Sequence, residues 1–144
     1  MKLRGFGLGA FVFGALAASA SPALAQEIPN LVGTWKGTAQ AVYVGENPYR
    51  LPERAGPNMP AKTIEFTFTI SEQQGNRISG QSTGSGHTET LIGAISPNNQ
   101  GGTILDDDGQ YLFTIRDTNT LDVCYSHLKP NDKVVACYAW KRAK

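Results

Sequence analysis

The stretch Lys62-Thr63-Ile64-Glu65-Phe66-Thr67-Phe68-Thr69-Ile70-Ser71 decides the fold class. Every second residue from Ile64 to Ile70 is apolar, and the residues between them are polar. Successive side chains of a β-strand point to opposite faces, so this pattern places all the apolar side chains on one face. The stretch therefore predicts a strand with one face in a core and the other face in water.

The same alternation recurs along the chain between short turns rich in Gly, Asn, Asp and Pro. Eight strands are expected, at residues 31–44, 62–71, 77–82, 87–96, 102–105, 110–116, 121–128 and 133–142. Short connections favour antiparallel neighbours, and closing the sheet buries its apolar face and removes its edges. We therefore expect an all-β fold, a single eight-stranded antiparallel up-and-down barrel; the alternative is a β-sandwich.

The last expected hairpin predicts a disulfide. If residues 129–132 form a four-residue loop, Leu128 pairs with Lys133, and the same register sets Cys124 directly opposite Cys137. Facing Cβ atoms lie about 4.5–5.5 Å apart, near the distance that a disulfide needs. We therefore expect a Cys124–Cys137 bond on the more polar outer face of this hairpin.

The alternation also predicts which side chains point into the barrel. An eight-stranded barrel is either filled by its side chains or just wide enough for one small ligand. The expected inward residues are Trp35, Ile64, Phe66, Phe68, Ile70, Ile78, Leu91, Ile95, Tyr111, Phe113, Ile115, Val123, Tyr125, Tyr138 and Trp140.

The first expected strand carries Gly33-Thr34-Trp35, and the last carries Arg142. A Gly-x-Trp on the first strand of a small all-β domain resembles the opening of calycin-like barrels, the group of lipocalins and avidins. The resemblance implies that Trp35 lies at the closed end of the barrel with Arg142 packed over it. The chain departs from avidins because its other Trp is Trp140, in the final strand, so biotin binding is not implied. It has no room for the external helix of lipocalins, and it also resembles small secreted bacterial β-domains of unassigned function.

The N-terminus has the three parts of a signal peptide. Lys2 and Arg4 are followed by an apolar run over residues 6–18 and by the small-x-small sequence Ala23-Leu24-Ala25. The run is shorter than the about 20 residues of a membrane span. We expect cleavage near Ala25, which separates a signal peptide at 1–25 from a domain at 26–144 in the bacterial periplasm or outside the cell. Two Cys fit such an oxidising compartment.

Charge excludes one class of partner. Removing Lys2 and Arg4 from the 13 basic residues leaves 11 against 12 acidic residues, with no large basic cluster. Nucleic-acid binding therefore has no electrostatic basis. No second apolar stretch predicts a membrane span after processing.

Residues 45–61 form the one long connection, and four prolines exclude a regular helix or a central strand there. Long loops of compact domains are usually functional or mobile. Tyr43, Tyr49 and Arg50 are the best candidates for recognition in and beside this loop, because aromatic and Arg side chains are enriched in binding surfaces. Together with the inward-facing Tyr125 and Tyr138 they are the expected ligand-binding residues.

No arrangement of residues predicts catalysis, a metal site or a cofactor. His87 and Glu89 share a strand face, but two His and no free thiol are too few for a zinc site. The run Asp106-Asp107-Asp108-Gly109 lacks the Glu six residues after its Gly that a calcium loop requires, and a tight turn explains it better. The sequence gives no reason to place two carboxylates together for acid–base chemistry.

Two functions remain, and neither is enzymatic. The first is an exported barrel that binds a small apolar or aromatic ligand in its lumen, with the loop 45–61 at the open mouth. The alternative is a protein-binding module such as a secreted protease inhibitor, which would use this loop or residues 26–30. A lumen with a cavity of about 300 Å³ or more favours the ligand, and a filled lumen with an ordered, protruding loop favours the protein partner.

Overall fold

The computed structural model describes residues 27–46, 49 and 51–144. The signal peptide expected at 1–25 and the candidate Arg50 lie outside these residues. Within them the structure is all-β, with no helix. The strands are β1 (Gly33–Ala39), β2 (Val42–Val44), β3 (Ile64–Gln74), β4 (Arg77–Gly84), β5 (His87–Ile95), β6 (Gly101–Leu105), β7 (Gln110–Asp117), β8 (Thr120–Lys129) and β9 (Asp132–Arg142).

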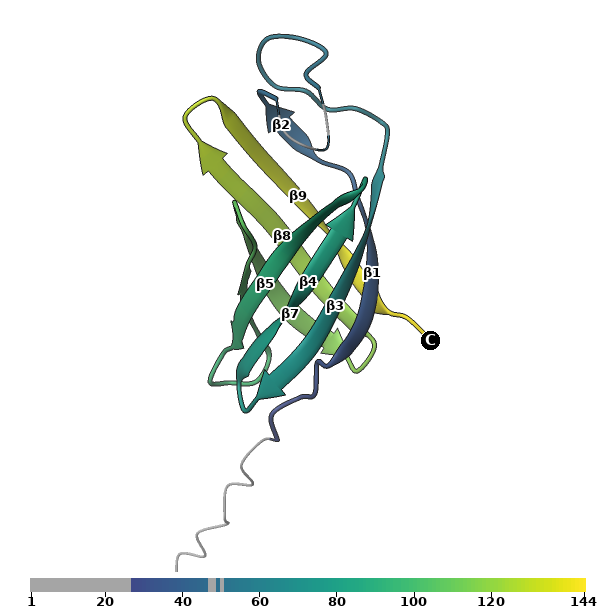
Figure 1. Ribbon diagram of the computed structural model, residues 1–144, viewed down its shortest axis with the longest axis vertical. Helices are drawn as coiled ribbons and strands as arrows, with labels where there is room; N and C mark the ends of the chain where they lie inside the picture. The colour runs from purple at the N-terminus through teal and green to yellow at the C-terminus, as the bar shows by residue number, and fades with distance from the viewer. Residues whose placement is uncertain (1–26, 47–48, 50) are drawn as a thin grey trace, which may run out of the picture.

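The strands close into an antiparallel up-and-down barrel (Figure 1). Each strand from β3 to β8 pairs with the next along the chain, and β1 pairs with both β3 and β9. This second pairing joins the two edges of the sheet, so the predicted eight-stranded barrel is confirmed and the sandwich alternative is wrong. Closure leaves the apolar face of every strand directed at one common interior.

The first strand differs from the prediction, because it breaks at Gln40 and Ala41 into β1 and β2. Trp35 faces Arg142 on β9, and Val42 faces Val135 in the same register, so β2 continues the path of β1 along β9. Beyond Ala39 the chain parts from β3, and the Gln40 side chain donates hydrogen bonds to the carbonyl oxygens of Pro60 and Ala61 instead. The result is a ninth, short strand at the barrel mouth.

Aromatic side chains fill the half of the barrel where β1 begins and β9 ends. Trp35, Phe68 and Trp140 are completely buried, and the Phe68 and Trp140 rings stack with centroids 3.6 Å apart. Tyr111 meets both Phe68 and Trp140 edge-on. The buried core agrees with the predicted inward face and adds Leu31, Ile104 and Leu121 to it.

Trp35 and Arg142 meet at this filled end. The Arg142 guanidinium carbon lies 4.1 Å from the centre of the Trp35 ring. The guanidinium also donates hydrogen bonds to the carbonyl oxygens of Val32, Asn30 and Thr118. Gly33 has a φ of 136°, and a Cβ on it would lie 2.9 Å from Arg142 Nη1, so Gly is required beside this cap.

The predicted disulfide is confirmed. Cys124 faces Cys137 in the β8–β9 register and is bonded to it. The turn between β8 and β9 contains two residues, Pro130 and Asn131, yet Leu128 pairs with Lys133 as expected. Both Cys are exposed on the outer wall. A structural disulfide of this kind indicates an oxidising, non-cytosolic environment.

Candidate functional site

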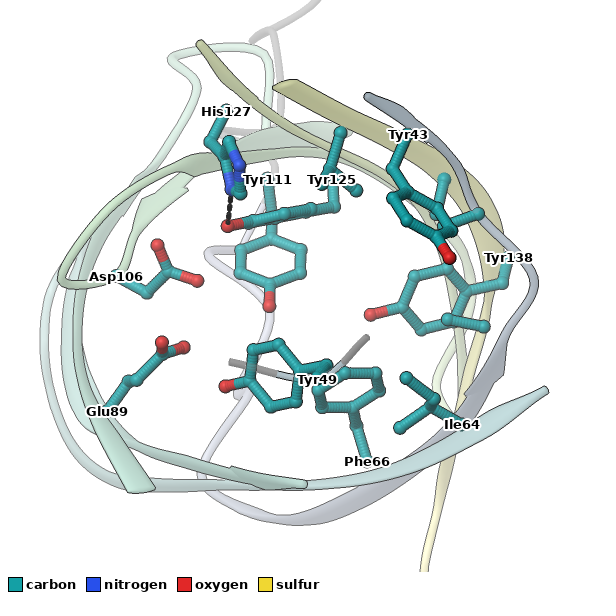
Figure 2. Close-up of a pocket in the computed structure, with 14 residues that line it drawn as sticks. Tyr43, Tyr49, Ile64, Phe66, Glu89, Asp106, Tyr111, Tyr125, His127 and Tyr138 are labelled. Carbon is teal, nitrogen blue, oxygen red and sulfur yellow. Dashed lines mark hydrogen bonds between the residues drawn. The ribbon is translucent and has the colours of Figure 1, made fainter. Parts of the chain in front are cut away.

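The half of the barrel opposite the Trp35–Arg142 cap contains a cavity of about 50 Å³ (Figure 2). The described part of the loop 45–61 and β2 lie at this end of the molecule (Figure 1), and Asp106, directly after β6, lines the cavity. The lining residues are Ala39, Ala41, Tyr43, Tyr49, Ile64, Phe66, Glu89, Asp106, Tyr111, Tyr125, His127, Val134, Ala136 and Tyr138.

The volume of this cavity lies between the two outcomes considered from the sequence, a filled lumen and a cavity of about 300 Å³ or more. The interior is not filled, and it is smaller than the about 300 Å³ typical of pockets for drug-sized ligands. A space of 50 Å³ holds roughly three to five waters or a ligand of a few non-hydrogen atoms. A molecule held in this space would therefore have to be very small.

Aromatic rings form most of the wall. The Tyr49 and Phe66 rings meet edge-on at 5.3 Å, and Tyr111 lies 4.7 Å from Tyr125. Tyr138 faces Phe66 at 6.5 Å. Figure 2 shows the hydroxyl groups of Tyr49, Tyr111 and Tyr138 directed into the enclosed space, and that of Tyr125 joined to His127 at its edge. The pocket is thus apolar along its sides and carries hydroxyl groups at several points.

Two carboxyl groups stand together on one side of the cavity, which corrects the expectation from sequence. Glu89 comes from β5 and Asp106 directly follows β6, and both face the cavity (Figure 2). Asp106 Oδ1 accepts hydrogen bonds from the backbone N–H groups of Gly109 (2.6 Å) and Asp108 (3.3 Å). Its Oδ2 is buried and has no donor within hydrogen-bond distance in the described part of the chain, although the Tyr111 hydroxyl is near enough to favour the Asp106 charge.

The shared environment alters the ionisation of both carboxyl groups. Burial and then the charge of Asp106 raise the pKa of Glu89 to about 7, against the opposing effect of a hydrogen bond from Tyr49. Burial also raises the pKa of Asp106, which the backbone hydrogen bonds only partly offset. Each group therefore resists taking on a negative charge.

A hydrogen-bond network lies beside the cavity. The Tyr125 hydroxyl donates to Asp108 (2.7 Å) and contacts His127 Nδ1 (3.0 Å), and His127 Nε2 lies 2.7 Å from Asp132. Lys129 forms an ion pair with Asp108 at 2.7 Å. Burial disfavours the Asp108 charge, but the hydrogen bonds from Lys129 and Tyr125 outweigh it and lower its pKa. The network fixes the Tyr125 ring against the cavity.

Four of the five expected ligand-binding residues line this cavity: Tyr43, Tyr49, Tyr125 and Tyr138. The Tyr43 hydroxyl donates to the carbonyl oxygen of Leu51, so this ring also ties β2 to the loop. Glu89, Asp106 and His127 were missed as ligand-binding candidates. Their signal was present in the alternation, since Glu89 shares a face with Leu91 and Asp106 shares one with Ile104.

The described part of the loop 45–61 is organised around buried Asn58. Asn58 exchanges two backbone hydrogen bonds with Tyr43, at 2.8 and 3.1 Å. Its side-chain oxygen accepts from the N–H groups of Glu53 and Arg54, and its amide donates to the carbonyl oxygens of Arg54 and Gly56. These contacts hold the loop over the same end of the barrel as the cavity.

The described residues hold no group of three or more His, Cys, Asp or Glu side chains that could bind a metal ion. Likewise, none of the described segments is a helix of the length and apolarity required to cross a membrane. The chain matches no protein-family model and no curated protein.

Replacing Glu89 by Gln is expected to change how stability depends on pH. Between its ordinary value of 4.5 and about 7, folded Glu89 keeps a proton that the unfolded chain releases. Its contribution to the free energy of unfolding is therefore full below the lower value and is lost as the pH rises through the window. In urea unfolding, the free energy of unfolding of Glu89→Gln should increase relative to that of the wild type as the pH rises from about 5 to about 8. Exposed Glu65→Gln is the control, and an unchanged difference across the window would refute the assignment.

Proposed function

We propose that the protein is an exported, non-enzymatic barrel that binds a small ligand in the open half of its lumen. The observation that carries this proposal is the 50 Å³ cavity walled by tyrosine rings beside the loop 45–61. Concave sites with mostly apolar walls and a few convergent polar groups are the usual form of small-molecule sites. The apolar part of the ligand would contact Tyr49, Tyr111 and Tyr138.

The packing of the other half supports a small ligand. The stack of Phe68 and Trp140 closes the floor below the cavity, so a bound molecule has no deeper space to enter. Only a few non-hydrogen atoms fit, either as a whole molecule or as one end of a longer one that leaves through the mouth.

We further propose that the barrel is calycin-like and works in the periplasm or outside the cell. The Arg142 guanidinium over the Trp35 ring at the filled end supports the first statement. The Cys124–Cys137 bond and the signal-like N-terminal sequence support the second.

A protein partner is the second candidate, and one observation favours it. Leu51 and Met59 on the loop are 71% and 70% exposed. Apolar side chains that protrude from an anchored loop are suited to insertion into another protein. This candidate predicts that changing both to Ser abolishes partner binding and leaves the lumen unaffected.

Native mass spectrometry of the protein purified from its own host tests the ligand proposal. We expect a small bound mass that is absent from an Ala136→Leu variant, because Ala136 lines the cavity and the larger side chain fills it. Ala139→Leu places the same addition on the outer face of β9 and should retain the mass. A wild type without bound mass, or equal mass on both variants, would reject luminal binding.

A further inference from the structure

We propose that the ligand of this cavity is a small organic cation, an ammonium group held between the aromatic rings and the carboxyl groups of Glu89 and Asp106. This inference rests on the proposed function and names the chemical class of its ligand.

The charges around the cavity leave two carboxyl groups uncompensated. Lys129 is paired with Asp108, and His127 with Asp132. No Lys or Arg is among the residues found to line the cavity, and Lys129, whose charge also acts on Glu89, is bound to Asp108. A ligand that brings a positive charge would complete this balance, whereas an anion would face both carboxylates.

The aromatic wall is suited to the same charge. The face of an aromatic ring carries negative potential and attracts ammonium groups within about 6 Å. Tyr49 hydrogen-bonds to Glu89, and both line the cavity together with Tyr111 and Asp106, so rings and carboxyl groups border the same space. A neutral apolar molecule would use the rings alone and leave the acidic side unused.

The buried Oδ2 of Asp106 points to the same ligand. No described donor lies within hydrogen-bond distance of it, and its one polar neighbour is the more distant Tyr111 hydroxyl, whereas Oδ1 of the same group accepts two backbone hydrogen bonds. Buried polar atoms normally have partners, and an orphaned acceptor marks a place where a donor or a cation is missing. An N–H group or a polarised methyl group of an ammonium ligand supplies what this oxygen lacks.

Binding of such a cation should depend on pH. The pKa of Glu89 is raised to about 7, so ionisation near this value converts the acidic side from neutral to charged. The titratable groups around Glu89 are Tyr49 on the loop, His87 on its own strand, Asp106, Asp107 and Asp108 on the turn after β6, Tyr111 on β7, Tyr125, His127 and Lys129 on β8, and Tyr138 on β9. If the ligand itself has no titratable group, any change of its affinity with pH comes from the ionisation of these protein groups alone.

Tetramethylammonium and tert-butanol are a matched pair of probes, since both have the same number of non-hydrogen atoms and only the first is charged. Titrations of the isotope-labelled full barrel, followed by two-dimensional NMR in matched sodium chloride, should give at least about tenfold tighter binding of the cation. Its affinity should rise from about pH 5 to about pH 8, and that of tert-butanol should stay constant.

Variants separate this inference from the function on which it rests. Glu89→Gln with Asp106→Asn should reduce tetramethylammonium binding to the level of tert-butanol, while exposed Glu65→Gln should not change it. Equal binding of both probes to the wild type would overturn the proposal of a cationic ligand but would leave the proposal of luminal ligand binding intact. Binding of neither probe would overturn the cation, and the bound mass from the host would then decide the proposed function separately.

Discussion

Replacing Trp35 by alanine is expected to lower the free energy of unfolding by about 3–5 kcal/mol. The indole is completely buried, and its Nε1 donates a hydrogen bond to the Leu31 carbonyl oxygen at 3.0 Å. Truncation removes apolar area, leaves a cavity under the Arg142 guanidinium and deprives that carbonyl of its donor. Urea unfolding followed by circular dichroism, with the disulfide intact, measures the loss.

Two further variants show whether the loss comes from the interior. Val32→Ala removes an exposed side chain just before the same strand and should change stability by less than about 0.5 kcal/mol. Trp35→Phe keeps an aromatic ring but loses the hydrogen bond, so its loss of stability should lie between those of Val32→Ala and Trp35→Ala. If Trp35→Ala were as stable as the wild type, Trp35 would not be a core residue, and this end of the barrel would not be filled by aromatic side chains.

The barrel was predictable because a single rule, alternation of polar and apolar residues, acts on every strand. The alternation within one strand identifies its inward face without information about the adjacent strands, as it does for Ile64, Phe66, Phe68 and Ile70. The β8–β9 register followed in the same way, since the position of one turn fixes every facing pair, including Cys124 and Cys137. Closure followed because an exposed apolar face and two free edges are unfavourable in water.

The acidic side of the cavity was not predicted, because charged residues on an inward face look like solvent-exposed ones when hydrophobicity alone is considered. Glu89 lies two residues from buried Leu91, and Asp106 lies two residues from buried Ile104. Strict alternation assigns both to the interior, although burying a carboxyl group is costly. A residue that follows the alternation against its own hydrophobicity is therefore a signal for a functional site.

The break at Gln40 and the volume of the cavity depend on tertiary packing that alternation does not describe. Gln40 bonds to carbonyl groups about twenty residues away, on a loop whose path is set by Asn58. The cavity arises because small side chains, Ala39, Ala41 and Ala136, stand opposite large rings. Whether such a space is filled depends on summed volumes across several strands.

Replacing both Cys124 and Cys137 by serine is expected to cost about 2–3 kcal/mol of stability. The bond closes a loop over a sequence separation of 13 residues. In the loop-entropy model, the cross-link raises the free energy of the unfolded chain by removing conformations from it. Urea unfolding of the oxidised wild type and the double variant measures this difference, and thiol titration of the unfolded wild type should find no free Cys.

The position of the bond allows its effect to be separated from packing. Both Cys lie on the outer wall of the barrel, so serine at these sites removes no core contact and buries no hydroxyl group. Wild type treated with a reducing agent should therefore match the double variant, and the reducing agent should leave the variant unchanged. The luminal cavity lies on the other face of β8 and β9, so the proposed ligand binding should be unchanged in the folded variant. Equal stability of oxidised and reduced wild type would show that the β8–β9 hydrogen bonds alone hold this register, and that the disulfide reflects only the oxidising compartment.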